Sequence, residues 1–463
     1  MIRRPAGPSV RVERAARAAR GSGRRLGRGL SAGRFSRLIV WRRFVTIPAG
    51  AASPAFAERG DTGREMMTTR IEEIRGGSGR RIENARRFFL RVHRLIGLSA
   101  GVVLVLMGLS GAILTYREAI DEQLNAALMR VVMPPGQAAL LPVETIVSAA
   151  LAAMPPGGRP ERLLMPRHAE ATAKLSYMVE TDDLDTSVRE IFVDPYTARV
   201  TGERLFLHGD DPFSQPLVQI LMTFHWTLFL GVNNAWIVGT LGIALFVSVG
   251  LGLYLWWPAN GNWRAGLKIK RGASRERMVF DLHKSVGVYC GAFLLVTLFT
   301  GVAMIFKPAT RAVTTMFSTV RADPDFGKSS PAPGRAPIGA GAAVASAERV
   351  FPEGRLHWIL FPATPTGVYV IGKQSDSEPN QTVTTRNVGV EQYTGEVLAI
   401  QDRARFTGGE RFLEWLFPLH SGEVFAGRAR PIVLVLGLAP LVLFMTGLLR
   451  WLQSRQTRRR MAR

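Results

Sequence analysis

Four long runs of apolar residues constrain this sequence more than any other feature. They cover Leu95–Tyr116, Ala235–Trp257, Val286–Phe306 and Pro431–Trp451. A helix of about 20 residues crosses ~30 Å of hydrocarbon, and a helix satisfies its own backbone polar groups inside lipid. The sequence therefore predicts a membrane protein with four transmembrane helices rather than one large soluble core.

Lys and Arg gather on one side of these predicted spans. They precede the first run, fill the segment between the second and third, and follow the fourth. The residues are Arg80, Arg81, Arg86, Arg87, Arg91, Arg94, Arg264, Lys268, Lys270, Arg271, Arg275, Arg277, Arg455, Arg458, Arg459 and Arg460. Short cytoplasmic segments are rich in Lys and Arg. We therefore expect a multi-pass protein of a bacterial inner membrane, with both termini in the cytoplasm.

Two segments of the chain, 117–230 and 307–428, then lie outside the membrane. Short alternating stretches such as Ala173–Val179 and Gly367–Ile371 predict strands, and Pro and Gly separate them. We expect an α+β protein with two periplasmic α/β domains. The expected divisions are a leader 1–84, spans 85–116, 231–257, 283–306 and 429–452, outer segments 117–230 and 307–428, a cytoplasmic loop 258–282 and a basic tail 453–463.

The leader carries much of the formal net charge of +23, because residues 1–43 hold thirteen Arg and one Glu. A basic tail can bind nucleic acid. No aromatic platform or known nucleic-acid motif accompanies this one, so we expect no nucleic-acid partner. It also lacks the apolar region of a secretory signal. The remaining interpretations are a disordered cytoplasmic tail or a misassigned start, with Met66 or Met67 as the true first residue.

The chain repeats itself. When His93 is placed over His283, Gly97, Gly101 and Gly111 fall on Gly287, Gly291 and Gly301, and Tyr116-Arg117 falls on Phe306-Lys307, without a gap. When His225 is placed over His420, Gly252 falls on Gly447 and Trp256 on Trp451. The stretch Phe192-Val-Asp-Pro-Tyr-Thr197 also resembles Val390-Glu-Gln-Tyr-Thr-Gly395. The sequence therefore predicts two parallel copies of a span, an outer domain and a second span.

Four of the seven histidines, His93, His225, His283 and His420, occupy repeated positions near the ends of spans. A histidine at a membrane interface is often an amphipathic side chain with its polar tip in water. Four repeated ones favour a function, because polar groups are costly to bury in a membrane. We expect His93 to meet His283 on the cytoplasmic face and His225 to meet His420 on the outer face. Pairing across adjacent spans is the alternative.

Two facing imidazoles ligate haem iron from both sides, so these four histidines predict two b-type haems. The single cysteine, Cys290, rules out a thiolate cluster. Gly97, Gly101, Gly287 and Gly291 are expected to leave room for the macrocycle, although glycine in a membrane helix usually marks close packing. His168, His208 and His357 are expected to be surface or local-structure residues, with His208 beside Asp210 and Asp211 as a metal candidate.

Several motifs resemble the PepSY-associated transmembrane helix family, whose members are often called iron-regulated membrane proteins. They are His93-Arg-Leu-Ile-Gly-Leu, Asp281-Leu-His-Lys-Ser-Val-Gly, Pro418-Leu-His-Ser-Gly-Glu-Val-Phe and the two Tyr-Thr elements, within about 85–455. The resemblance implies PepSY-like periplasmic domains, haem in the membrane on these four histidines, and in some relatives the reduction of ferric siderophores. The sequence departs from the family at Ala198, where Gly is usual, which predicts a looser turn.

Three functions compete. The first is a haem-dependent oxidoreductase that passes electrons to a periplasmic ferric siderophore or another acceptor. The chain has no dinucleotide motif, so we expect a quinol or a cytoplasmic reductase to supply the electrons. The second is an iron or siderophore transporter, which predicts polar groups inside the spans. The four runs contain no Asp, Glu, Lys, Asn or Gln, and the one Arg in them, Arg450, lies next to the end of the last run. The third is a PepSY membrane module that regulates a peptidase.

Overall fold

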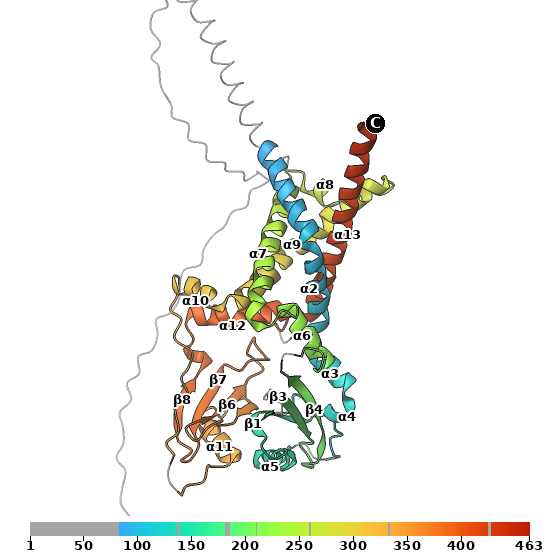
Figure 1. The fold of residues 1–463 in the computed structure, drawn as a ribbon. Coiled ribbons are helices and arrows are strands. Elements are labelled where there is room, and N and C mark those ends of the chain that lie inside the picture. Colours follow the sequence, from blue (N-terminus) through green and yellow to red (C-terminus); the bar gives the residue numbers. More distant parts are fainter. Residues whose placement is uncertain are drawn as a thin grey trace, which may run out of the picture. The chain divides into compact units, whose positions relative to one another are not determined.

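The computed structural model describes residues 83–136, 139–180, 186–209, 211–258, 261–331, 334–424 and 427–463. All but the last two residues of the expected leader 1–84 therefore lie outside the described residues. The described residues belong to one compact unit, Ile74–Arg463. In this unit a bundle of long helices meets a β-sheet at one end (Figure 1).

The bundle is built from α2 (Gly101–Leu114), α7 (Ala235–Trp256), α9 (Arg275–Ile305) and α13 (Arg430–Met461). Helix α7 packs against α9, and α13 packs against α2 and α9. Among the described residues, three helical segments are long and apolar enough to cross a membrane: Leu217–Trp256, Arg275–Ile305 and Arg430–Met461. A fourth candidate exists if the helix Glu83–Ser99 and α2 form one span. The chain is thus a multi-pass membrane protein by length and composition.

The helix Glu83–Ser99 and α2 are bent by 57° relative to one another. The bend falls at Ser99-Ala100-Gly101, and the Ser99 hydroxyl donates to the Leu95 carbonyl at 2.8 Å. Neighbouring Ser and Gly are a common cause of sharp helix bends, because a side chain that bonds back competes with the helical ladder. The bend therefore has a local sequence cause.

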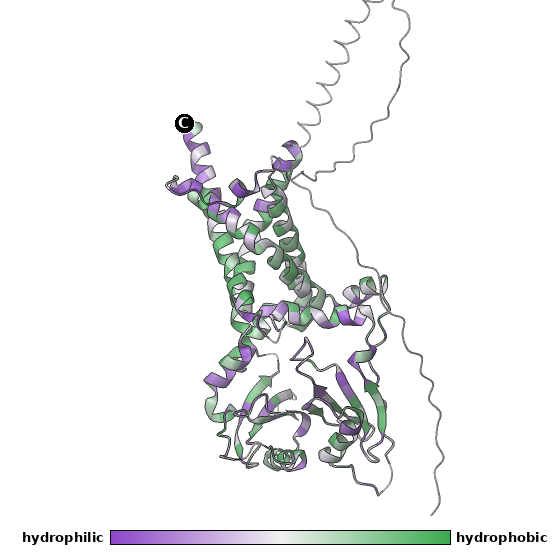
Figure 2. Ribbon diagram, turned by 180° about the vertical axis from the view of Figure 1, so that it is seen from behind, coloured by the Kyte–Doolittle hydropathy of each residue, from purple (hydrophilic) through white to green (hydrophobic). Residues whose placement is uncertain are grey.

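Two helices extend beyond the apolar runs. Helix α9 begins at Arg275, where Ser274 caps it by accepting from the Arg277 amide, so part of the expected loop 258–282 is helical. Helix α13 continues to Met461, past the expected end at 452. Figure 2 shows the bundle as hydrophobic in its middle and hydrophilic at the end away from the sheet.

Eight strands form one antiparallel sheet in the order β4-β3-β2-β1-β5-β6-β7-β8. Each half of the sheet follows a helix: α5 precedes β1 to β4, and α11 precedes β5 to β8. The bounds are α5 Val143–Ala153, β1 Arg159–Leu164, β2 Ala173–Glu180, β3 Thr186–Val193, β4 Val200–His208, α11 Ala340–Val350, β5 Arg355–Leu360, β6 Val368–Gln374, β7 Arg386–Glu391 and β8 Val397–Gln401. The strands predicted at Ala173–Val179 and Gly367–Ile371 are confirmed as β2 and β6.

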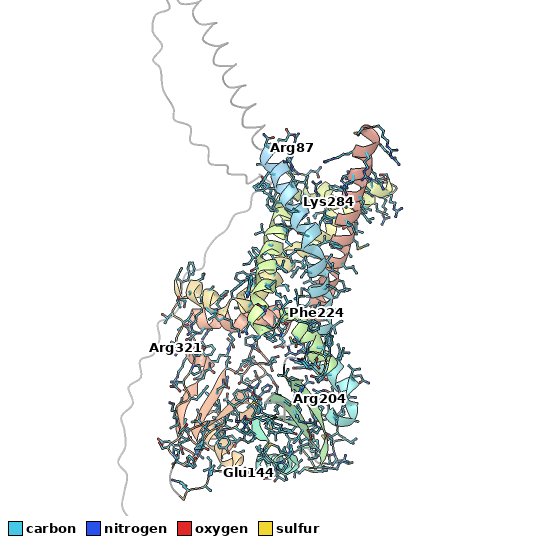
Figure 3. The ribbon with its side chains drawn as sticks, viewed as in Figure 1. Arg87, Glu144, Arg204, Phe224, Lys284 and Arg321 are labelled. Carbon is cyan, nitrogen blue, oxygen red and sulfur yellow. The ribbon has the colours of Figure 1, made fainter. Side chains whose placement is uncertain are left out.

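The two outer segments, expected as two domains, share this sheet and one core. Strand β1 pairs with β5, with Leu163 opposite Ile359. Alternate side chains of β2 point inward, where Leu175 and Tyr177 join Ile146 of α5 and Val344 of α11 in one buried cluster. The Glu144 carboxylate of α5, labelled in Figure 3, accepts from the Gly341 amide at 2.7 Å. The halves are therefore joined through strands, core and a helix contact.

Shorter helices connect the sheet to the bundle. Helices α10 and α12 lie across the sheet-side end of the bundle (Figure 1). Thr407 and Glu410 form a capping box, which explains why α12 begins at Gly408. The bounds are α3 Arg117–Leu124, α4 Ala126–Met129, α6 Leu217–Thr227, η2 Val232–Asn234, α8 Trp263–Leu267, α10 Lys307–Thr315, η3 Arg403–Arg405 and α12 Gly408–Ser421.

The two Tyr-Thr elements form matching turns between β3 and β4 and between β7 and β8. The Ala198 amide donates to the Asp194 carbonyl at 2.9 Å, and the Gly395 amide donates to the Glu391 carbonyl at 3.1 Å. Ala198 has φ of 58° and Gly395 has φ of 75°. The prediction of a looser turn at Ala198 was wrong, because alanine adopts the left-handed conformation that glycine adopts freely.

We expect the substitution Ala198→Gly to stabilise the protein. A left-handed conformation costs an L-residue about 1–2 kcal/mol, and the extra freedom of glycine in the unfolded chain cancels part of that gain. A net gain of about 0.5–1 kcal/mol should raise the midpoint of thermal unfolding. The reciprocal control is Gly395→Ala, whose Cβ would meet Ile338 at an acceptable 3.5 Å and should destabilise through φ alone. A lower midpoint for Ala198→Gly would contradict this account.

Candidate functional site

Two of the repeated histidines meet where the bundle joins the sheet. His225 lies near the end of α6, and His420 lies at the end of α12. Their ring centroids are 6.1 Å apart and the ring planes make an angle of 61°. Phe224, the neighbour of His225, marks this junction in Figure 3. We call His225 and His420 the sheet-side pair.

The other two repeated histidines meet toward the opposite end of the bundle. His93 lies on the helix Glu83–Ser99, and His283 lies on α9. Their ring centroids are 6.3 Å apart and the planes make an angle of 73°. We call them the far-side pair. The structure therefore brings the four histidines together in twos, and each pair takes one residue from each half of the chain.

Three of the four imidazoles are held through the Nδ1 atom by a backbone carbonyl of a facing helix. His93 contacts the Ser248 carbonyl at 2.8 Å, His283 the Leu443 carbonyl at 3.1 Å and His420 the Thr297 carbonyl at 3.0 Å. A carbonyl oxygen accepts and does not donate, so Nδ1 carries the proton in these three rings. The Nε2 lone pair of these rings is left available as a metal ligand.

Hydroxyl groups support the same atoms. The Ser110 hydroxyl lies 2.9 Å from His225 Nδ1, Thr300 3.2 Å from His420 Nδ1, Ser248 3.1 Å from His93 Nδ1 and Thr446 2.9 Å from His283 Nδ1. Ser110 and Thr300 are also equivalent when His93 is aligned with His283. Such outer-shell bonds fix the tautomer and the orientation of metal-binding histidines. Sequence reasoning missed these hydroxyls, because Ser and Thr are common in membrane helices.

Glycines lie directly against the rings. A Cβ atom at Gly111 would lie 2.9 Å from His225, and one at Gly301 would lie 3.0 Å from His420. At Gly252 it would lie 3.1 Å from His93, and at Gly447 it would lie 3.4 Å from His283. A side chain at Gly111, Gly301 or Gly252 would therefore press on the ring, whereas Gly447 lies at ordinary contact distance.

The glycines predicted to leave room for a macrocycle are different ones, and two of them face a side chain of a neighbouring helix. A Cβ at Gly101 would meet Phe444 at 2.7 Å, and one at Gly291 would meet Leu253 at 2.8 Å, so these positions serve helix packing. Gly287 faces Leu443 at 3.6 Å, and Gly97 has no atom within 4 Å.

The spacing of both pairs suits a metal ion held between the rings. Two metal–nitrogen bonds of about 2.0 Å and two ring radii of about 1.1 Å separate the centroids of two axial imidazoles by roughly 6.2 Å. The observed 6.1 and 6.3 Å agree with this separation. Two imidazoles supply two of the six ligands of octahedral iron, and a porphyrin supplies the other four. The donor set and spacing therefore fit a bis-histidine haem at each pair.

A large cavity adjoins the sheet-side pair. Its volume is about 1600 Å³, and both His225 and His420 line it. Around the histidines the lining is mostly apolar, with Met107, Leu294 and Leu436 among the wall residues. Towards the second half of the sheet the lining becomes polar, through Asn380, Thr384, Thr385, Asn387, Gln401, Asp402, Arg405, Glu410 and Glu414. The cavity thus joins a site inside the bundle to a polar chamber outside it.

The remaining histidines take part in local contacts. His168 Nε2 lies 2.9 Å from a Glu122 carboxylate oxygen, and His208 Nδ1 lies 2.7 Å from the Ser187 hydroxyl. His357 is buried in β5, and burial lowers its pKa to about 4. No group of three His, Cys, Asp or Glu in the described part of the chain could hold a metal ion. The metal candidate at His208 gains no support, and Asp210 lies outside the described residues.

These features define a class: multi-pass membrane proteins with an extramembrane antiparallel sheet and half-buried, paired histidines between their helices. The family profile of the PepSY-associated TM region matches residues 90–454, which is most of the chain. The protein belongs to this family, as its motifs predicted. Comparison with curated proteins gave no match.

Proposed function

We propose that this protein is an inner-membrane electron-transfer protein that binds two b-type haems. In this proposal the chain crosses the membrane four times as two parallel repeats. His93 and His283 ligate one haem, and His225 and His420 ligate the other. The observation that carries the proposal is the arrangement of the rings: two pairs, 6.1 and 6.3 Å apart, each ring tied through Nδ1.

His93 with His283 and His225 with His420 would hold the haems, and haem iron bound by two histidines would supply a reversible one-electron centre. This arrangement suits electron transfer better than chemistry on a bound substrate. The protein's part is to hold the rings, and the carbonyl and hydroxyl partners at Nδ1 do so. The apolar wall around the sheet-side pair lowers the local dielectric, which would tune the redox potential.

Two repeated cations are suited to the carboxylates of a haem at the sheet-side pair. Arg117 and Lys307 are equivalent in the repeat alignment, and both line the cavity that contains His225 and His420. Arg117 also contacts the Phe417 ring and the Thr382 hydroxyl, which hold its guanidinium in place. Charge-assisted bonds from such cations to the haem carboxylates would fix the orientation of the macrocycle.

The distribution of charge gives the proposed direction of electron flow. Basic residues cluster at the end of the bundle away from the sheet, and this supports a cytoplasmic location for that end. The sheet and the cavity then face the periplasm. Electrons from a quinol or a cytoplasmic reductase would pass from the far-side pair to the sheet-side pair and on to a ferric siderophore or another periplasmic acceptor. The polar chamber next to the sheet-side pair provides a place for that acceptor.

A spectrum of the purified protein tests the proposal. Protein expressed with sufficient iron should show the Soret and α bands of b-type haem after reduction with dithionite, with two haems per chain. Protein without these bands would overturn the proposal. Uptake of iron chelates by proteoliposomes without reductant would favour a transporter instead. Capture of a peptidase by haem-free protein would favour a regulatory module.

A further inference from the structure

Helix α12 forms a wall of the cavity and carries two acidic residues besides His420. Glu410 and Glu414 line the cavity towards the sheet, and His420 lines it inside the bundle. The spacing of 410, 414, 417 and 421 corresponds to one face of a helix. This face therefore connects the sheet-side pair to two carboxylates of the outer chamber.

The first of these carboxylates is fully engaged. Glu410 accepts from the Arg321 side chain through both oxygens, at 2.8 and 2.6 Å, and from the amides of Arg321 and Thr407. The hydrogen bonds from Arg321 lower the pKa of Glu410 to about 2. These bonds therefore favour the ionised form of Glu410. Figure 3 labels Arg321 beside the end of α12.

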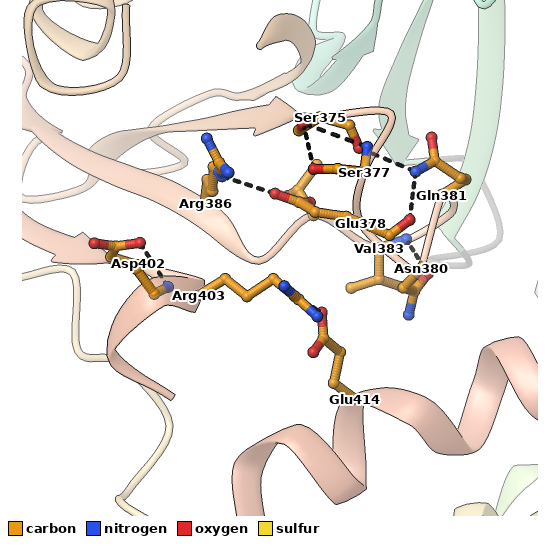
Figure 4. Close-up of polar contacts among 12 residues, drawn as sticks. Ser375, Ser377, Glu378, Asn380, Gln381, Val383, Arg386, Asp402, Arg403 and Glu414 are labelled. Atoms are coloured by element: carbon orange, nitrogen blue, oxygen red, sulfur yellow. Dashed lines mark hydrogen bonds and ion pairs between the residues drawn. The ribbon is translucent and has the colours of Figure 1, made fainter. Parts of the chain in front are cut away.

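The second carboxylate is different. The Glu414 side chain is 2% exposed, and one of its oxygens lies 2.6 Å from Nε of Arg403 (Figure 4). Its other oxygen, Oε2, is buried and has no hydrogen-bond partner among the described residues. A buried carboxylate with an unsatisfied oxygen is costly when charged, and a proton on that oxygen removes much of the cost.

A second buried carboxylate lies next to this pair. The Glu378 side chain is 1% exposed and lies 2.7 Å from Nε of Arg386. Burial raises the pKa of Glu378, and the charge of Glu414 raises it further. Besides Glu414, the charged groups that line this part of the cavity are Lys307, Arg311, Arg321, Asp323, Asp402, Arg405 and Glu410. Carboxylates and guanidiniums are therefore nearly balanced here, and a proton on Glu414 changes that balance.

The first repeat lacks this acid. When His225 is aligned with His420, Gln219 on α6 takes the position of Glu414. A neutral amide of similar shape thus suffices to build the equivalent helix of the first half. The ionisable group at this position therefore belongs only to the second half of the chain, and the strands of that half line the cavity.

We propose that Glu414 binds a proton when the sheet-side site gains an electron and releases it when that electron leaves. This inference rests on the proposed function. One electron arrives from the quinol or reductase, and one proton moves from the water of the chamber to the Glu414 carboxylate. When the electron passes to the acceptor, the proton returns to the water. The added negative charge favours the protonated acid, and the unpartnered Oε2 is where the proton binds.

Redox titration of the purified haem protein at several pH values tests this coupling. The sheet-side haem is identified as the redox component that is missing from His420→Ala. Its midpoint potential should fall as the pH rises. The limit is about 59 mV per pH unit for one proton per electron. Glu414→Gln should make that potential independent of pH over the same range. The far-side haem, which His420→Ala retains, is the internal control. The pH profile of its midpoint potential should be the same in Glu414→Gln as in the wild type.

Glu410→Gln is the matched control, because it removes a carboxylate one helical turn away whose bonds favour the ionised form. It should keep the pH dependence, and so should Glu414→Asp, with a shifted midpoint pH. A pH-independent wild-type potential, or a dependence that persists in Glu414→Gln, would overturn the inference. Protein without haem would instead overturn the proposed function. If Glu414→Gln cannot be purified, an unshifted profile in Glu414→Asp also overturns the inference.

Discussion

Replacing His420 with alanine should remove one of two haems from the purified protein, and replacing His225 should remove the same one. His93→Ala and His283→Ala should each remove the other haem. A single axial imidazole holds haem far more weakly than two, and each removed ring leaves its partner alone. Haem per polypeptide should fall from two to about one in every single variant, since each site depends on both of its axial ligands.

The absorbance of the reduced protein, divided by its concentration, measures this loss. The double variant His225→Ala/His420→Ala should retain one haem, because both changes affect one site. The double variant His93→Ala/His420→Ala should retain none. His208→Ala is the control and should keep both haems, because His208 bonds to Ser187 in the sheet. Retention of one haem by His93→Ala/His420→Ala would show that the ligands pair differently.

The substitution Gly437→Leu should strongly destabilise the helix bundle. A Cβ at Gly437 would lie 2.6 Å from the Gly108 carbonyl oxygen and 2.7 Å from the Ala112 Cβ. A Cβ at Gly108 would lie 2.6 Å from the Gly437 carbonyl oxygen. Helices α2 and α13 therefore approach each other through backbone, and a leucine must push them apart. Overpacking of this kind costs about 3 kcal/mol.

The midpoint of thermal unfolding in detergent measures this effect. Separation of α2 from α13 should also displace Ser110 and Gly111, which contact His225, so the sheet-side haem should be lost first. Gly250→Leu is the matched control, because its Cβ would have no atom within 4 Å. That variant should unfold near the wild-type temperature. Equal midpoints for Gly437→Leu and the wild type would contradict the close helix contact.

Much of the architecture could be predicted from the sequence. The apolar runs predicted the long helices, because only a helix satisfies its backbone inside lipid. Alternating residues predicted β2 and β6. The gap-free alignment of His93 with His283 and of His225 with His420 predicted which histidines would meet, because repeats about a common axis bring equivalent positions together.

The ends of the elements were harder to predict. Helix α9 starts at Arg275 because Ser274 caps it, although the apolar run begins at Val286. The left-handed Ala198 keeps the same hydrogen bond as Gly395, although alanine disfavours that conformation. Caps and turns depend on a few local bonds that hydrophobic patterns do not record.

The tertiary structure decided the rest. The sequence by itself determined that four histidines recur, that long helices cross the membrane near them, and that strands and helices alternate outside. It did not determine that β1 and β5 join the two halves in one sheet, or that Gly111, Gly252, Gly301 and Gly447 face the rings. It also did not determine that Glu414 lines the same cavity as His420. A repeat fixes which residue types are present along each helix, whereas contacts depend on how each helix is rotated against its neighbours, and only packing sets that rotation.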